Sequence, residues 1–173
     1  MEEGFTAIEE RAFVRREREG QIGRAVILDL DACCTSASGA PEVLDATDLV
    51  ISHARREVLA RYHAEGWKLF VRAWRPQVSQ GTLGADAVAS TFNRLRDLLG
   101  LDFDTGCCPH DAGPPVCWCR MPLPGLVLEF AARHRLRLTE SFVIGDGASD
   151  RTLAQRLGAI HLEAGQFFTA ARP

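Results

Sequence analysis

Two aspartates, Asp29 and Asp31, follow directly from an apolar run and are the first residues whose type and spacing indicate chemistry. The run, residues 25–28, is too short for a buried helix and predicts a strand covered on both faces, as in a parallel sheet. Ligands of such sheets bind beyond the carboxyl ends of the strands. If the strand continues past Asp29, the two carboxylates point the same way and can share one cation while one of them attacks.

Asp29 also interrupts the apolar run, because Leu30 follows it. A buried carboxylate there would cost several kcal/mol unless a cation lay beside it. The alternative for either aspartate alone is that it caps a turn, since Asp is a common turn residue.

A second group of reactive side chains consists of Cys108-x-His110 and Cys117-x-Cys119, which flank a loop-forming segment. Three thiolates and one imidazole satisfy tetrahedral zinc, and four protein ligands leave no open position, so the sequence predicts a structural site that orders a long loop. The neighbouring Cys107 is an alternative ligand to Cys108. The other possibility is a loop with free cysteines.

Two further pairs resemble these groups without the same context. Cys33 and Cys34 lie beside the carboxylates, and we expect small buried thiols, with a reactive thiol as the lesser alternative. Asp102 and Asp104 repeat the Asp-x-Asp spacing, but a helical pattern precedes them, so we expect surface residues.

The composition bounds the class of protein. At 173 residues the chain fits one domain with a core of useful size. A net charge of -3 argues against general nucleic-acid binding. No apolar stretch approaches the roughly 18 residues of a membrane span, and the glutamate-rich start is not typical of a signal peptide. We therefore expect a cytoplasmic protein, in which six cysteines favour metal binding over disulfides.

Predicted strands and helices alternate along the chain, which indicates an α/β fold with a doubly wound parallel sheet and right-handed crossovers. The predicted strands are residues 25–28, 67–71, 101–105, 141–144 and 159–162. Two predicted helices cover residues 52–64 and 88–99. Two more contain residues 126–131 and 153–157. Residues 32–48 are expected to form a loop or short flap over the strand ends, and residues 72–84 a second loop.

Residues 1–20 form a predicted charged helix that ends at Gly20 and precedes a single domain, residues 21–173. Because this helix comes before the first sheet strand, we expect it to pack on the domain or on a second subunit. A homodimer through this helix is the corresponding expectation.

Together these motifs resemble the haloacid dehalogenase superfamily, specifically its heptose-bisphosphate and histidinol-phosphate phosphatases. The resemblance rests on the strand followed by Asp-x-Asp, on Cys-x-His with Cys-x-Cys-Arg-x-Pro, and on the late Gly-Asp-x-x-x-Asp at residues 145–150. It spans about residues 24–162. It implies a Rossmann-like core in which a zinc-bound loop replaces a large cap domain.

The resemblance also implies a mechanism. Asp29 would attack phosphorus and form an aspartyl phosphate, while Asp31 would protonate the leaving alcohol and later activate water. Magnesium would be held by the Asp29 carboxylate, the main-chain carbonyl of Asp31 and Asp146, with Asp150 in support. A cation is needed because an anionic nucleophile and an anionic phosphate repel each other.

The chain departs from the family pattern in three places. The family usually follows its second aspartate with Gly-Thr, where this chain has Ala32 and Cys33. After its second strand the family places Thr or Ser and then Asn, where this chain has Ala73 and Trp74. The family's phosphate-binding lysine falls at Met121, and the only lysine of the chain, Lys68, lies near the start of its strand.

The missing cation has two candidate replacements, Arg120 and Arg75, because Arg binds phosphate through paired donors. Trp74 is a third candidate for the substrate site.

The first hypothesis is a magnesium-dependent phosphohydrolase of a small phosphorylated metabolite, such as a sugar or polyol phosphate. The alternative is a catalytically impaired relative that binds a ligand or partner. A further alternative is different chemistry on the same scaffold, with Trp74 stacking on an organic substrate and Cys33 or Cys34 taking part.

Overall fold

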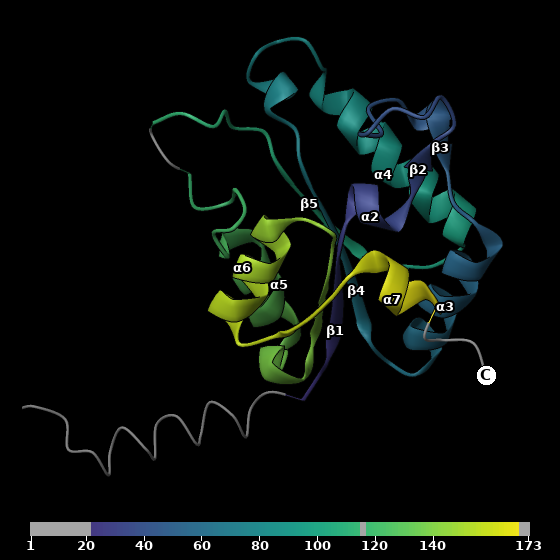
Figure 1. Ribbon diagram of the computed structural model, residues 1–173, viewed down its shortest axis with the longest axis vertical. Coiled ribbons are helices and arrows are strands. Elements are labelled where there is room, and N and C mark those ends of the chain that lie inside the picture. The colour runs from purple at the N-terminus through teal and green to yellow at the C-terminus, as the bar shows by residue number, and fades with distance from the viewer. Residues whose placement is uncertain (1–21, 115–116, 170–173) are drawn as a thin grey trace, which may run out of the picture.

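A parallel five-stranded sheet forms the centre of the computed structural model, which describes residues 22–114 and 117–169 (Figure 1). The strand order is β5-β4-β1-β6-β7, and every neighbouring pair is parallel. The strands are β1 (Ala25–Asp29), β4 (Lys68–Trp74), β5 (Asp104–Cys108), β6 (Phe142–Ile144) and β7 (Ile160–Leu162). The predicted parallel sheet is confirmed. The predicted N-terminal helix lies outside the described residues.

Helices cover both faces of this sheet (Figure 1). One face carries α3 (His53–Ala64), α4 (Ala85–Leu99) and α7 (Ala164–Thr169), and the other carries α5 (Gly125–His134) and α6 (Ala148–Leu157). No helix of the described residues is both long enough and apolar enough for a bilayer. The described residues, 22–114 and 117–169, contain no separate cap domain.

The apolar run of β1 reflects burial on both faces. Val26 and Leu28 join the core beneath α3, α4 and α7, whereas Ala25 and Ile27 join the core beneath α5 and α6. Since strand side chains alternate between faces, Asp29 follows Ile27 onto the α5 and α6 side.

The strand does not continue past Asp29, so the condition under which its carboxylate and that of Asp31 were expected to point the same way is not met. A short helix, α2 (Leu30–Cys33), begins immediately, and Asp29 Oδ2 accepts a hydrogen bond from the Asp31 amide at 3.3 Å. Asp is a favoured N-cap because its carboxylate satisfies an otherwise unpaired amide. Asp29 therefore caps the first turn of α2, as the alternative interpretation predicted. It also lies at the end of β1, as expected.

The segment predicted as a loop or flap contains regular structure. Strands β2 (Thr35–Ser36) and β3 (Leu49–Val50) pair antiparallel, and a 3-10 helix, η1 (Ala46–Asp48), precedes β3 and packs on α4. The carboxylate of Asp48 accepts hydrogen bonds from the hydroxyls of Ser36 and Ser38. We refer to residues 35–50 as the flap.

Strand β4 is longer than predicted. Residues 72–74, expected in a loop, continue the strand because they pair with β1 and β5. A buried arginine, Arg72, breaks the apolar pattern that marks the rest of the strand.

Smaller differences concern element boundaries. Strand β5 begins at Asp104 rather than residue 101, and α7 lies in a stretch for which we predicted no helix. In α3, Val58 and Leu59 are buried.

The second Asp-x-Asp pair lies at the amino end of β5, away from the carboxyl ends of the strands. Asp102 is exposed, as expected, and Asp104 is partly buried because Arg133 and His134 each contact it at 2.9 Å.

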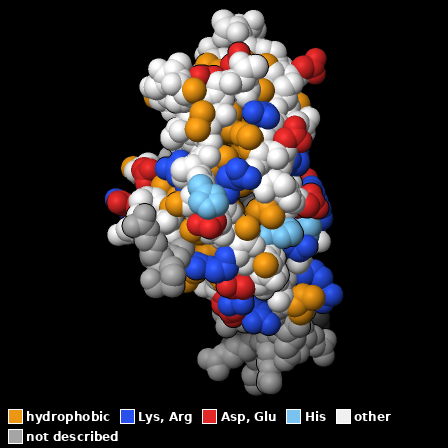
Figure 2. All heavy atoms as spheres, turned by 90° about the vertical axis from the view of Figure 1, so that its right-hand side faces the viewer, with side chains coloured by type: hydrophobic (Ala, Val, Ile, Leu, Met, Phe, Trp, Pro, Cys, Tyr) orange, Lys and Arg blue, Asp and Glu red, His pale blue; other side chains and the backbone are white. Residues whose placement is uncertain are grey.

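Figure 2 shows acidic and basic side chains interspersed on the face that it presents, with no single basic patch. That face therefore lacks the concentrated positive charge typical of nucleic-acid binding.

Candidate active site and metal centre

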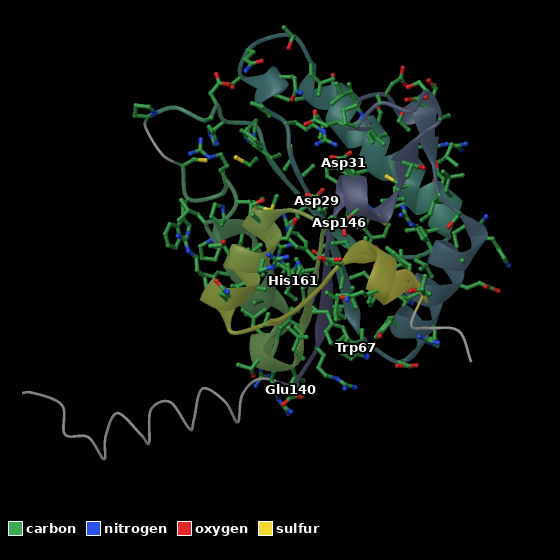
Figure 3. The ribbon with its side chains drawn as sticks, in the orientation of Figure 1. Asp29, Asp31, Trp67, Glu140, Asp146 and His161 are labelled. Atoms are coloured by element: carbon green, nitrogen blue, oxygen red, sulfur yellow. The ribbon has the colours of Figure 1, made fainter. Side chains whose placement is uncertain are left out.

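Charged residues from three neighbouring strands meet at the carboxyl edge of the sheet. Asp29 ends β1, Arg72 lies beside it in the register of β4, and Asp146 follows β6 (Figure 3). Parallel strands bring their carboxyl ends to one edge, so residues far apart in the sequence converge there.

Arg72 is the centre of this group, although the side chain is only 2% exposed. Its Nη1 lies 3.5 Å from Asp29 Oδ1, and its Nη2 forms an ion pair with Asp150 Oδ1. The Nε and Nη1 groups have no hydrogen-bond partner. One guanidinium therefore links the carboxylates of β1 and α6.

The late Gly-Asp-x-x-x-Asp motif has a steric reason. Asp150 packs so closely on Gly145 that a Cβ at that glycine would collide with the carboxyl group. Asp150 also accepts a hydrogen bond from the Gly147 amide at 3.0 Å, which caps the first turn of α6. The glycine thus allows Asp150 to reach Arg72.

Burial raises the pKa of Asp29 from 3.8 to about 6. The guanidinium of Arg72 opposes this shift, while the carboxylates of Asp150 and Asp31 add to it, and Arg75 opposes it more weakly. A carboxylate with a raised pKa gains stability from any additional cation that binds beside it.

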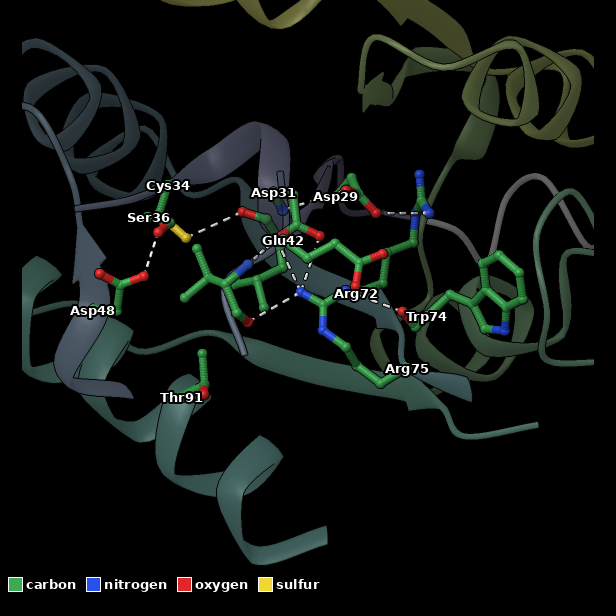
Figure 4. Close-up of polar contacts among 12 residues, drawn as sticks. Asp29, Asp31, Cys34, Ser36, Glu42, Asp48, Arg72, Trp74, Arg75 and Thr91 are labelled. Carbon is green, nitrogen blue, oxygen red and sulfur yellow. Dashed lines mark hydrogen bonds and ion pairs between the residues drawn. The ribbon is translucent and has the colours of Figure 1, made fainter. Parts of the chain in front are cut away.

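Asp31 faces a different arginine. Both of its carboxylate oxygens lie 2.9 Å from Nη2 of Arg75, which is 3% exposed, and Oδ1 also accepts a hydrogen bond from the Val43 amide at 2.8 Å (Figure 4). Arg75 further donates to the carbonyls of Val43 and Trp74. Arg75, predicted as a substrate cation, therefore holds Asp31 against the flap.

Asp146 is exposed, in contrast to the buried Asp150. Its Oδ1 accepts a hydrogen bond from the Ala164 amide at 2.8 Å, at the start of α7. Figure 3 shows Asp146 at the same edge of the sheet as Asp29 and Asp31.

Four residues of the loop between β5 and α5 form a group that could hold a metal ion. Their ligand atoms all lie within 4.8 Å of one another, and the members are Cys108, His110, Cys117 and Cys119. Sγ of Cys108 lies 3.5 Å from that of Cys117 and 3.4 Å from that of Cys119, and 3.7 Å from Nδ1 of His110. A tetrahedron with Zn–S bonds of about 2.3 Å and a Zn–N bond of about 2.0 Å requires separations of about 3.8 and 3.5 Å. The spacing fits tetrahedral zinc.

Strand β5 decides between the two adjacent cysteines. Cys108 joins the cluster, whereas Cys107 packs against the opposite core, beneath α4. Alternation along a strand separates consecutive side chains in this way.

Trp74 and Arg120, both predicted for the substrate site, brace this loop. The indole of Trp74 donates to the carbonyl of His110 at 2.8 Å, and Arg120 donates to the carbonyl of Asp111. At the far end of the loop, Trp118 packs so tightly on Gly125 that a Cβ there would collide with the ring.

Known proteins resemble this chain, although no family model matches it. A D-glycero-beta-D-manno-heptose-1,7-bisphosphate 7-phosphatase from Rhodopseudomonas palustris is 31% identical over 58% of this chain and 61% of its own length. A Thermoplasma acidophilum protein named "Probable D-glycero-D-manno-heptose-1,7-bisphosphate 7-phosphatase" is 29% identical over 82% of this chain and 89% of its own length. The crystal structure of D,D-heptose 1,7-bisphosphate phosphatase from B. bronchiseptica, complexed with magnesium and phosphate, matches with a TM-score of 0.69 and 21% identity, covering 80% of this chain and 78% of that one.

These similarities agree with the resemblance of the sequence motifs to phosphatases of the haloacid dehalogenase superfamily. The chain's alignments with the first two curated relatives, from Rhodopseudomonas palustris and Mesorhizobium japonicum, span 61% and 65% of their lengths, less than two thirds. The likeness to the crystal structure, at 21% identity, shows the fold.

Within this fold, the residue that faces Asp29 from β4 is Arg72. Ala73, to which the resemblance assigned the hydroxyl residue, is buried in the opposite core, beneath α3 and α4. Arg72 was not predicted as a site residue because the predicted strand ended at residue 71, three residues before the observed end of β4. The available signal was a charge flanked by Val71 and Ala73, which matches the way in which Asp29 interrupts β1.

A small hollow separates Arg72 from the metal-binding loop. Trp74, Cys119 and Met121 contribute to its wall together with Arg72, and its volume is about 10 Å³. A cavity of this size holds about one water molecule.

Cys33 and Cys34 are both fully buried, which confirms the expectation of core thiols. Burial raises the pKa of Cys33 to about 12 and also raises that of Cys34. Since the thiolate is the nucleophile, the alternative of a reactive thiol is not supported.

Proposed function

We propose that this protein is a magnesium-dependent phosphohydrolase of a small phosphorylated metabolite, such as a sugar or polyol phosphate. The carrying observation is the carboxylate of Asp29, which ends a buried central strand beside the guanidinium of Arg72 at 3.5 Å. The names of the relatives, which are heptose bisphosphate phosphatases, support the substrate class.

Asp29 is the nucleophile of this proposal. One of its carboxylate oxygens attacks phosphorus, the bond from phosphorus to the ester oxygen breaks, and an aspartyl phosphate forms. Asp31 gives a proton to the leaving alkoxide and then removes one from the water that hydrolyses the aspartyl phosphate, which returns free Asp29 and inorganic phosphate.

Asp31 needs freedom to exchange that proton. Both of its carboxylate oxygens accept hydrogen bonds from Arg75. The flap is connected to this pair through Val43, whose amide donates to Asp31 and whose carbonyl accepts from Arg75. We therefore expect the ester oxygen of a bound substrate to displace one of these contacts.

The donor set at the sheet edge fits magnesium. Asp29, the main-chain carbonyl of Asp31, and Asp146 offer the hard oxygen ligands that this ion prefers. The bound ion would screen the repulsion between Asp29 and the phosphate. Charge balance supports it, because the four carboxylates of Asp29, Asp31, Asp146 and Asp150 exceed the two guanidinium groups by two negative charges.

Asp150 has a narrower role in this proposal than the resemblance implied. Asp150 is 4% exposed, and its carboxylate already contacts Arg72 and the Gly147 amide. We assign it to holding Arg72 rather than to contacting the ion.

We assign zinc to the Cys and His cluster in a structural role. Four protein ligands complete a tetrahedral shell and leave no place for a substrate atom. The ion would fix the loop that carries Arg120 and Met121 beside the strand ends.

Release of inorganic phosphate from a panel of sugar and polyol phosphates, with and without Mg²⁺, tests the proposal. The Asp29→Asn variant, confirmed as folded, is the matched blank because Asn keeps the shape and the N-cap. We expect Mg²⁺-dependent release that vanishes in the blank. Equal release by the variant would exclude Asp29 as nucleophile.

One observation favours a second candidate function, a binding protein without turnover. The hollow beside Arg72, at about 10 Å³, has no room for a phosphate group, and Met121 stands where the family has lysine. Silence across the panel by folded, zinc-loaded protein would favour this candidate.

A further inference from the structure

Arg72 is the only arginine that contacts the proposed nucleophile among the described residues, and it is buried with two unpaired donors. Nη2 is taken by Asp150, while Nε and Nη1 lack hydrogen-bond partners and Nη1 faces Asp29. Buried polar groups are normally satisfied, so such an arrangement requires an explanation.

The other candidate cations do not reach Asp29 in the described structure. Arg75 donates to Asp31 and to the Val43 carbonyl of the flap, and Arg120 donates to the Asp111 carbonyl of the metal-binding loop. Lys68 is exposed and pairs with Ala25, at the opposite end of β1 from Asp29. The positive charge beside the proposed nucleophile therefore comes from Arg72.

Met121 lies close to the same place. It lines the small hollow that Arg72 also lines, and it packs against the core beneath α5 and α6. An uncharged side chain at position 121 and a guanidinium at position 72 thus adjoin one space, where two cations would repel each other.

We infer that Arg72 is a positioning residue that supplies, from β4, the fixed positive charge beside the proposed nucleophile. This inference rests on the proposed function. Arg72 orients the carboxylate of Asp29 and offsets the charge that a phosphate brings to it. Asp150 holds the guanidinium in place, and Gly145 makes the room for Asp150.

Moving the charge from β4 to the metal-binding loop is the direct test. We would compare wild type with Arg72→Met, with the double variant Arg72→Met and Met121→Lys, and with Arg133→Met as a control that removes a distant arginine. Circular dichroism and zinc content establish that each variant is folded. If Arg72→Met does not fold, adding Asp150→Asn removes the buried unpaired carboxylate and keeps the test open.

We expect Arg72→Met to lower kcat by about 100- to 1000-fold, the effect of losing one preorganised electrostatic partner, with a smaller change in KM. Adding Met121→Lys should raise kcat at least about tenfold above that of Arg72→Met alone. Arg133→Met should leave kcat unchanged. A merely structural role for Arg72 would give no rescue from position 121. Unchanged kcat in folded Arg72→Met, or a folded double variant without rescue, would overturn the inference.

A binding measurement separates this inference from the proposed function. Inorganic phosphate with Mg²⁺ should raise the Tm of wild type and of the double variant, but not that of Arg72→Met. Phosphate binding that follows this pattern without any turnover of the panel would refute the phosphohydrolase and keep the inference. Absence of both turnover and phosphate binding in wild type would refute both.

Discussion

Asp29 should weaken the fold of the magnesium-free protein at neutral pH, and Asp29→Asn should therefore stabilise it. Burial raises the pKa of this carboxyl from 3.8 to about 6, so the folded state favours the neutral form. Above pH 6 the buried group is charged, and that charge costs free energy that the unfolded chain does not pay. Below about pH 4 the group is neutral in both states and the cost disappears.

The size of the effect follows from the shift. The pKa of Asp29 differs by about two between the unfolded and the folded state. At 1.36 kcal/mol for each unit of pKa, this corresponds to about 3 kcal/mol at pH 7. Asn matches the shape of the protonated acid and is an equally good N-cap for α2, so the capping contribution remains. The free energy of unfolding of the variant should exceed that of wild type by about 3 kcal/mol at pH 7 and by under about 1 kcal/mol at pH 4.

Urea denaturation from pH 4 to pH 8 measures this difference. Magnesium should be omitted rather than chelated, because a chelator would also remove zinc from the Cys and His cluster. Comparing two proteins at each pH cancels the titration of all other groups. Adding Mg²⁺ at pH 7 should stabilise wild type and shrink the gap, since the variant lacks a charged ligand.

Two results would refute the reasoning. A gap that is constant from pH 4 to pH 8 would mean that Asp29 has an ordinary pKa in the fold. A variant less stable than wild type at pH 7 would mean that the contact between Asp29 and Arg72 outweighs the cost of burial.

Three further changes probe the supporting structure. Removing zinc, or replacing Cys119 by Ser, should lower the Tm, because the metal-binding loop loses its cross-link; an unchanged melting curve would argue against a structural metal. Gly145→Ala should destabilise the fold and abolish turnover, because the new Cβ displaces Asp150 and with it Arg72; Gly113→Ala, where a Cβ meets nothing within 4 Å, is the control. Trp74→Phe should cost about 1 kcal/mol in urea denaturation, the usual contribution of one hydrogen bond, here that from the indole to His110; a loss near zero would show that this bond contributes nothing.

Hydrophobic pattern was sufficient to predict the sheet. The apolar run of β1 and the periodic residues of α4 were placed correctly because each segment buries what its pattern indicates. The pattern failed where a charge is buried, at Arg72, since a guanidinium in a strand is stabilised only by partners that a linear sequence does not place. The register of β4 against β1 brings those partners together.

The metal-binding cluster was predictable for a different reason. Its four ligands lie within twelve residues, so local spacing carried the information. The choice between Cys107 and Cys108 needed more than local spacing, because consecutive thiols of a strand lie on opposite faces. A correct start at Asp104 would have placed the two thiols on opposite faces without selecting between them; the position of His110 selects Cys108.

The charges at the sheet edge form two pairs, and the pairs explain why both aspartates depend on β4. Arg72 meets Asp29 and Arg75 meets Asp31, from the same strand end and three residues apart. One pair fixes the proposed nucleophile to the sheet, while the other fixes the proposed acid to the flap through Val43. A substrate that enters must disturb the second pair and leave the first intact. Opening of the flap and the protonation of the leaving group would thus share a single contact, that between Arg75 and Asp31.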